Sequence, residues 1–186
     1  FEDKIDPQVG LDNWESALQQ LQQRGTLEFK LTQLLFDRDH PGHYCRQISS
    51  VEVDLPVLTG PYENVRATLL QISSMIATKE STQSVRYLHD PEGATGPSDV
   101  QVNLRSGQQI VLSMGIADNG MTAMKPDEGL LNPFENTGAV SRWTLNFPRP
   151  TKEAQHAMLL SLTDVIVRIR FTAKAGKPTF ARTVED

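Results

Sequence analysis

The chain has 186 residues, of which 38% are hydrophobic and 22% charged, and its formal net charge is -5. This length and composition suit one globular domain with a sizeable buried core. The negative charge and the lack of a Lys/Arg run argue against a nucleic-acid partner, because a phosphate backbone attracts a basic surface. The single cysteine excludes an intrachain disulfide, and no apolar run approaches the roughly 20 residues that a membrane helix needs.

The N-terminal part of the chain predicts a short helix and then a strand. Residues 1–10 have no periodicity and begin Phe-Glu-Asp-Lys, so we expect no signal peptide there and interpret them as the leader of a processed or excised domain. Apolar residues at helical spacing predict an amphipathic helix from about 12 to 24, which ends at Gly25. The period then changes to two, which predicts a half-buried strand from 27 to 31.

Residues 35–44 form a polar, turn-rich segment that we call the polar corner. Two carboxylates and two imidazoles surround its Pro-Gly turn, and they are candidate metal ligands: Asp37, Asp39, His40 and His43. No HExxH motif or other mechanistic ligand spacing accompanies them. Carboxylates and ring nitrogens also satisfy backbone groups at a turn, and we favour this structural interpretation.

The middle of the chain predicts strands separated by turns. A strand from 51 to 57 alternates apolar and polar residues, and Pro56 marks its edge or its end. A tight turn at 59–64 leads to a strand from 65 to 76, whose apolar residues change phase and so predict a bulge. The Ser-, Gly- and Pro-rich stretch from 78 to 99 predicts a long, partly mobile surface loop.

The second half begins with a predicted hairpin. Its strands are 100–104 and 110–114, and Ser106-Gly107 forms the turn. A second loop follows over 115–136. Exposed loops on a rigid scaffold are where binding residues concentrate, so Asp118, Asn119 and Glu128 are candidate partner contacts.

The C-terminal part predicts two more strands around one short helix. The first strand ends before Pro148 and places its inner face toward the core, with Trp143, Leu145 and Phe147 on that face. A helix is expected from 151 to about 160. The last strand alternates from Val165 to Thr172, and a polar tail begins at Lys174.

These elements together predict a mainly β protein, an antiparallel β-sandwich with one short N-terminal helix. The sandwich domain is placed at 25–186, and 1–24 are assigned to a leader and helix. We expect the polar corner and the following turn to define its shape. The residues assigned to this structural corner are Asp37, Asp39, Pro41, Gly42, His43, Tyr44, Gly60, Pro61 and Tyr62.

The remaining motifs give no positive indication of catalysis. His43 and Cys45 suggest a cysteine nucleophile, but two residues on one strand face are not oriented for proton transfer, and a small buried cysteine is the better interpretation. Asp118-Asn119-Gly120 lacks the spaced acidic ligands of a calcium loop. Neither a Gly-rich phosphate loop nor a G-x-S-x-G elbow is present.

Five segments resemble the C-terminal region of the A subunits of Tc toxins, the insecticidal toxin complexes of bacteria. They occur in the family's order and span roughly residues 27 to 176. The first, LFDRDHPGHYCRQISSV, contains the polar corner, and the second is TGPYENVRATL at 59–69. The others are QIV with DNGM, FENTGAVSRW at 134–143 and TDVIVRIRFTA at 163–173.

This resemblance implies a TcB-binding domain that docks a TcB-TcC cocoon onto a pentameric translocation channel. It implies protein-protein assembly without catalysis, a secreted or cell-surface toxin complex, and no cofactor, nucleic acid or direct membrane contact. The helix within residues 1–24 would then be either the end of the preceding channel region or a leader that is not native to the domain. Two alternatives stay open: a metal-dependent or hydrolytic sandwich that uses the polar corner, and a carbohydrate-binding module.

Overall fold

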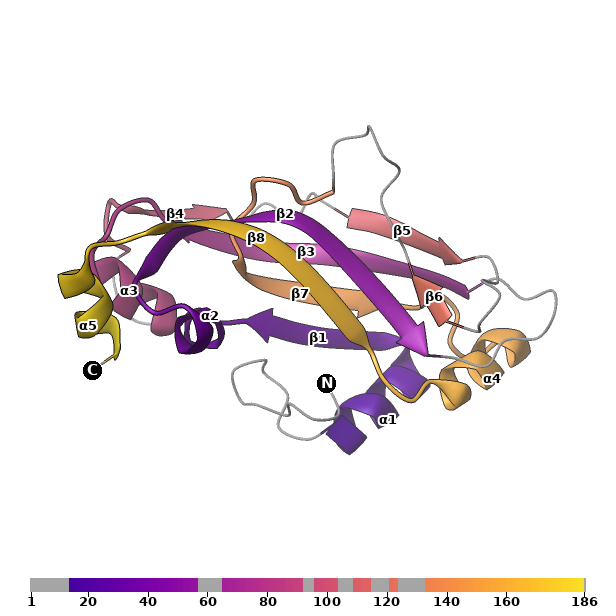
Figure 1. Cartoon of the computed structure of the whole chain (residues 1–186). Coiled ribbons are helices and arrows are strands. Elements are labelled where there is room, and N and C mark those ends of the chain that lie inside the picture. The colour runs from indigo at the N-terminus through magenta and orange to yellow at the C-terminus, as the bar shows by residue number, and fades with distance from the viewer. Residues whose placement is uncertain are drawn as a thin grey trace.

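The computed structural model describes residues 14–56, 65–91, 96–103, 109–114, 121–123 and 133–185. Two antiparallel sheets face each other, as Figure 1 shows. The larger sheet has the order β1-β7-β3, and β4 and β5 both pair with the remaining edge of β3. Its strands are β1 (Thr26–Leu31), β3 (Val65–Ala77), β4 (Val100–Asn103), β5 (Gln109–Met114) and β7 (Val140–Asn146).

The smaller sheet has the order β6-β2-β8 and consists of β2 (His43–Pro56), β6 (Met121–Ala123) and β8 (Ile166–Ala175). The predicted sandwich of antiparallel strands is therefore confirmed. β2 ends at Pro56 as expected, but it begins eight residues earlier than predicted, inside the polar corner. Sequence alternation missed this first half because its register against β8 shifts twice, between Tyr44 and Gln47 and between Ile48 and Ser50.

The predicted hairpin of 100–104 and 110–114 is wrong. β4 and β5 do not pair with each other; they lie one after the other along the same edge of β3. β4 pairs with Ser74–Ala77, and β5 pairs with Val65–Leu70. Turn residues between two alternating segments predict a reversal, but here the chain continues in the same direction, and the predicted turn at Ser106-Gly107 lies outside the described residues.

The bulge expected in the strand after the 59–64 turn is confirmed in β3. Its pairing with β7 shifts between Gln71 and Ser73. Before the shift, buried side chains such as Leu69 occupy odd positions, and after it Ser74 is buried. The bulge adds one residue to β3, so that side chains on both sides of it still face the core.

Five helices of the described part of the chain cover the two ends of the sandwich. α1 (Trp14–Arg24) and α4 (Glu153–Ser161) pack together at one end, and both agree with the predictions. Gly25 ends α1 with a left-handed φ of +69°, and its N–H donates to the carbonyl of Leu21 over 2.8 Å. No helix in the described part of the chain has both the length and the apolar character needed to cross a membrane.

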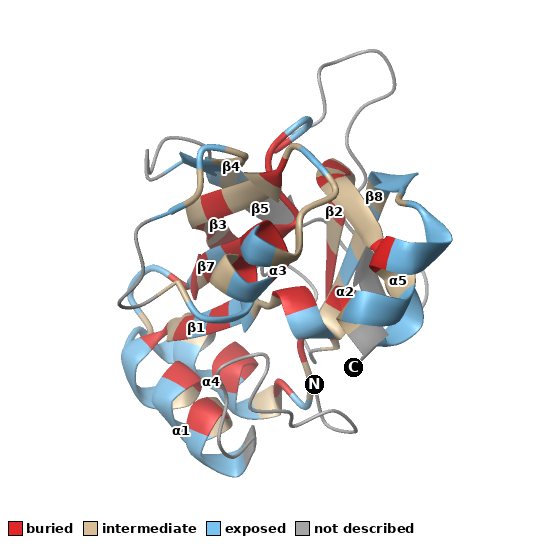
Figure 2. Ribbon diagram, turned by 90° about the vertical axis from the view of Figure 1, so that its left-hand side faces the viewer, coloured by how far each residue is buried: buried red, intermediate tan, exposed pale blue. Residues whose placement is uncertain are grey.

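Three helices that the sequence did not predict lie at the other end (Figures 1 and 2). α2 (Gln33–Asp39) lies in the polar corner, α3 (Thr82–His89) replaces part of the expected 78–99 loop, and α5 (Pro178–Glu185) replaces part of the polar tail. α2 and α3 each bury three side chains, and among the described side chains of α5 only Phe180 is buried, which is too little periodicity to stand out in a polar stretch. We call this group the helical cap.

The core lies between the sheets, and Trp143 is its largest buried side chain. The Trp143 ring lies edge-on to Phe134 with centroids 4.7 Å apart and stacks parallel to Phe29 at 6.3 Å. Its indole N–H donates to the hydroxyl of Ser141 over 2.7 Å, so its one polar atom is satisfied. The predicted inner rows of β1, β2 and β7 are confirmed as core where the structure describes them, except that Leu31 of β1 is only partly buried and packs against the core. Val57, predicted on the inner row of β2, lies outside the described residues.

Replacing Trp143 with alanine should lower the free energy of unfolding by about 3–5 kcal/mol, because it removes an aromatic side chain from a packed site. Urea denaturation followed by circular dichroism measures this. Val111→Ala, at a side chain that is 66% exposed on β5, is the control and should change stability by less than about 0.5 kcal/mol. Equal losses for the two variants would contradict this description of the core.

Candidate functional site

The polar corner is built by α2, the turn at Pro41-Gly42 and the start of β2. Phe36 and Asp37 of α2 face inward and are buried. At the C-terminal end of the helix, the N–H of His40 donates to the carbonyl of Phe36 over 2.9 Å. The chain then reverses through Gly42, whose φ is +73°.

Asp37 is the centre of this corner. The guanidinium of Arg46, itself 4% exposed, donates to Asp37 Oδ1 over 2.7 Å and to the carbonyl of His40 over 2.9 Å. The Gln33 amide donates to both carboxylate oxygens, at 3.1 and 3.0 Å. His89 Nε2, from the last residue of α3, lies 3.2 Å from Oδ2. One carboxylate therefore connects α2, β2 and α3.

The pKa of Asp37 reflects competing influences. Burial alone raises it, but hydrogen bonds from His89, Arg46 and Gln33 and the charge of Arg46 outweigh burial and hold the pKa below its ordinary value of 3.8. Arg46 Nη2 and the carboxylate thus form a buried ion pair with additional hydrogen bonds. The arrangement stabilises an ionised Asp37 and leaves it no role as a proton carrier near neutral pH.

The four candidate metal ligands do not converge. Both oxygens of Asp37 are engaged as described, and Asp39 lies exposed at the end of α2. The rings of His40 and His43 stack on each other with centroids 5.4 Å apart and planes 9° apart. Among the described residues, no group of three His, Cys, Asp or Glu side chains is arranged to hold a metal ion.

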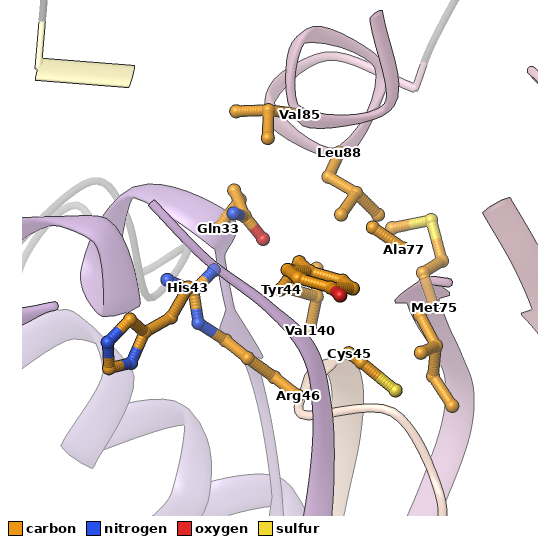
Figure 3. A pocket seen from close by; sticks show the side chains of 11 residues that line it. Gln33, His43, Tyr44, Cys45, Arg46, Met75, Ala77, Val85, Leu88 and Val140 are labelled. Carbon is orange, nitrogen blue, oxygen red and sulfur yellow. The ribbon is translucent and has the colours of Figure 1, made fainter. Parts of the chain in front are cut away.

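The pairing of His43 with Cys45 also fails as a nucleophile and base. Cys45 has a left-handed φ of +53°, so the two side chains do not share a strand face as the sequence suggested. Figure 3 shows the His43 ring and the Cys45 thiol pointing away from each other. Cys45 is also half-buried, not buried as expected.

A small cavity lies beneath α3, where Val85 and Leu88 meet Tyr44, Cys45 and Met75 (Figure 3). Its volume is about 10 Å³. That is room for about one water molecule and far below the roughly 300 Å³ of a small-molecule site. We therefore describe it as a packing gap between the helical cap and the sheets.

The turn of the corner is held from the far end of the chain. Gly176 N–H donates to the carbonyl of Gly42 over 3.0 Å, and a Cβ on Gly42 would lie 2.5 Å from the Ala181 Cα of α5. Lys177 bonds to Glu80 through its backbone N–H at 2.8 Å and its ammonium at 3.1 Å. The predicted corner role of Pro41, Gly42 and Tyr44 thus involves a helix that the sequence did not predict.

Sequence reasoning found Asp37 but missed its partners Gln33, Arg46 and His89. A signal for Arg46 existed, because it lies two residues before the buried Ile48 and so belongs to the inward row of β2. His89 had no comparable signal, since its helix was interpreted as a loop. The remaining candidates Gly60, Pro61, Tyr62, Asp118, Asn119 and Glu128 lie outside the described residues.

The carbohydrate alternative gains no support from the described aromatic side chains. Phe29, Phe134, Trp143 and Phe147 are at most 2% exposed and pack in the core, and Tyr44, Tyr87 and Phe171 are partly buried. The fold and the corner therefore define a class: a helix-capped β-sandwich whose most prominent polar cluster is structural.

Within that class, the chain belongs to the family of Tc toxin complex TcA C-terminal TcB-binding domains, whose model matches residues 4–173. It is also 35% identical over 173 residues to the toxin subunit YenA2 of Yersinia entomophaga. That match covers 93% of this chain and 12% of YenA2. The family resemblance inferred from the sequence is therefore confirmed.

Two solved structures show similarity over most of the chain. One is Yersinia pseudotuberculosis TcaA-TcaB, with 28% identity, a TM-score of 0.47, and coverage of 82% of this chain and 7% of the other. The other is Morganella morganii TcdA4, with 26% identity, a TM-score of 0.44, and coverage of 80% and 6%. The chain thus spans only a small part of the length of these relatives.

Changing Asp37 to asparagine should lower the free energy of unfolding at pH 7 by about 3–5 kcal/mol, because Arg46 would stay buried without its counter-charge. The folded-state pKa of Asp37 is lowered, so its contribution is fully present above 3.8 and is lost as the pH falls through the folded value. The difference between the variant and the wild type should therefore shrink below pH 3.8.

Denaturant unfolding from pH 7 to pH 3 measures this difference. The matched control is Asp39→Asn, two residues away at an exposed side chain, which should change stability by less than about 0.5 kcal/mol. A pH-independent difference for Asp37→Asn, or an equal loss for both variants, would contradict the structural role.

Proposed function

We propose that this chain docks a TcB-TcC cocoon onto the pentameric translocation channel of a Tc toxin A subunit and acts without catalysis. The single observation that carries the proposal is the TcB-binding family match over residues 4–173. A secreted or cell-surface toxin complex, with this domain in a homopentamer and away from membrane and nucleic acid, follows from the same family assignment.

The geometry supports a binding role through rigidity. The buried Asp37 cluster joins three elements at one end, and α1 and α4 pack together at the other. A scaffold stiffened at both ends presents its edges and loops with little ordering cost on association. Asp37, one of the polar residues that first suggested chemistry, is engaged in this cluster, whereas Asp39 stays exposed.

The structure revises the loop expected at 78–99 but not the proposed contact residues. The 78–99 segment is not a free loop, because Ser84, Val85 and Leu88 of α3 are buried. The 115–136 segment contains β6 and connects the larger sheet, through β5, to the smaller sheet. We retain Asp118, Asn119 and Glu128 as proposed contacts for the partner.

The proposal predicts that the purified chain binds its cognate TcB-TcC with micromolar or tighter affinity in biolayer interferometry. Display on a pentameric scaffold should increase the avidity by about 10²-fold or more if several copies engage together. An unrelated β-sandwich on the same scaffold is the control. Absence of binding by the pentameric display would contradict the proposed function.

A further inference from the structure

An apolar groove runs along one open side of the sandwich. Its volume is about 370 Å³, within the range of protein binding pockets. Asp39 and His40 of the polar corner lie at its polar end. Its apolar lining comes from β1, α2 and β8 and consists of Leu31, Leu35, Phe36, Val167, Ile169 and Phe171.

The groove lies between the edge strands of the two sheets. Among the described residues, β1 pairs only with β7 and β8 pairs only with β2. β8 is ten residues long, and no described strand pairs with its second edge, so this edge presents an extended row of backbone groups. Such an edge is a template for an additional strand.

The inner row of β8 is less buried than the strand it pairs with. Ile169 and Val167 lie opposite Val51 and Val53, which are 5% and 1% exposed. Ile169, Val167 and Phe171 are only partly buried, because the groove beside them is open. An occupant with apolar side chains would complete their burial.

The outer row of β8 determines which strand can pair there. Arg168 and Arg170 pair with Asp54 and Glu52 of β2, yet their side chains stay 53% and 76% exposed. Lys174 is exposed on the same strand. A second copy of β8 would bring further basic residues against this row, which is unfavourable, whereas acidic residues on a partner strand would be favourable.

We propose that the groove binds an extended segment of TcB that adds a strand to the free edge of β8. Its inward residues are apolar and fill the groove, and its outward residues are acidic and face Arg168 and Arg170. The inference rests on the proposed function, which supplies TcB as the partner. It adds the binding mode and the residues that select the segment.

Ile169→Asp tests the groove, because it places a carboxylate among apolar side chains that the segment would contact. TcB-TcC affinity should fall at least ten-fold relative to the wild type in the pentameric display. Val111→Asp is the matched control, because Val111 is exposed on β5 of the larger sheet and does not line the groove. This change should leave the affinity within two-fold. Urea unfolding of both variants reports whether either has lost its fold.

Hydrogen exchange on the wild-type chain tests the same inference without a substitution. Amides of β8 should gain protection when TcB-TcC binds, and amides of β4 should not. Binding of the wild type without protection of β8 would overturn the groove as the site while the proposed function stands. Absence of binding by the wild type would overturn both.

Discussion

Asp37 places a negative charge inside the protein, and a buried ion costs several kcal/mol unless partners replace its lost hydration. Three side chains contact the carboxylate in place of water: Gln33 from the same helix, Arg46 from β2 and His89 from α3. The pair forms only when α2, the start of β2 and α3 are all in place. This contact therefore links α2 and α3 of the helical cap to the first half of β2.

Within the cap, the polar corner is further linked to the C-terminal helix α5, mostly by backbone contacts. Gly42 turns the chain between Asp37 and Arg46, and Gly176 and Ala181 pack on that turn. Lys177, the residue before α5, bonds to Glu80. Glu80 directly precedes Ser81, the N-cap residue of α3. Segments from the first, middle and last parts of the sequence thus close one end of the sandwich. The side between β1 and β8 keeps a groove lined mostly by buried and partly buried apolar residues.

Much of the sandwich could be predicted from period-two alternation, because Leu27, Trp143 and Leu145 lie on faces buried by the opposite sheet. Alternation failed wherever the backbone departs from a regular strand. Cys45, with its positive φ, hides the start of β2, and the 104–108 segment was taken for a reversal although β4 and β5 continue along one edge of β3. Short helices with few buried side chains, such as α3, carry too little periodicity to be found.

The polar corner shows a different limit. Its residue types suggested metal binding or catalysis. The structure argues against a metal site that includes Asp37, because other side chains engage both of its carboxylate oxygens. Those partners are separated in sequence by up to 52 positions, from Asp37 to His89, and come together only in the fold. The segment that carries the family resemblance therefore contains, in the structure, one half of the buried ion pair between Asp37 and Arg46.

A double-mutant cycle on Asp37 and Arg46 at pH 7 tests this account most directly. Asp37→Asn, Arg46→Gln and the double variant would be unfolded in urea, and their free energies of unfolding compared with the wild type. The account predicts a coupling energy above about 1.5 kcal/mol, since residues in one hydrogen-bonded ion-pair network couple by roughly 0.5–3 kcal/mol. Additivity within about 0.3 kcal/mol would contradict it, because the helical cap would then not depend on this pair.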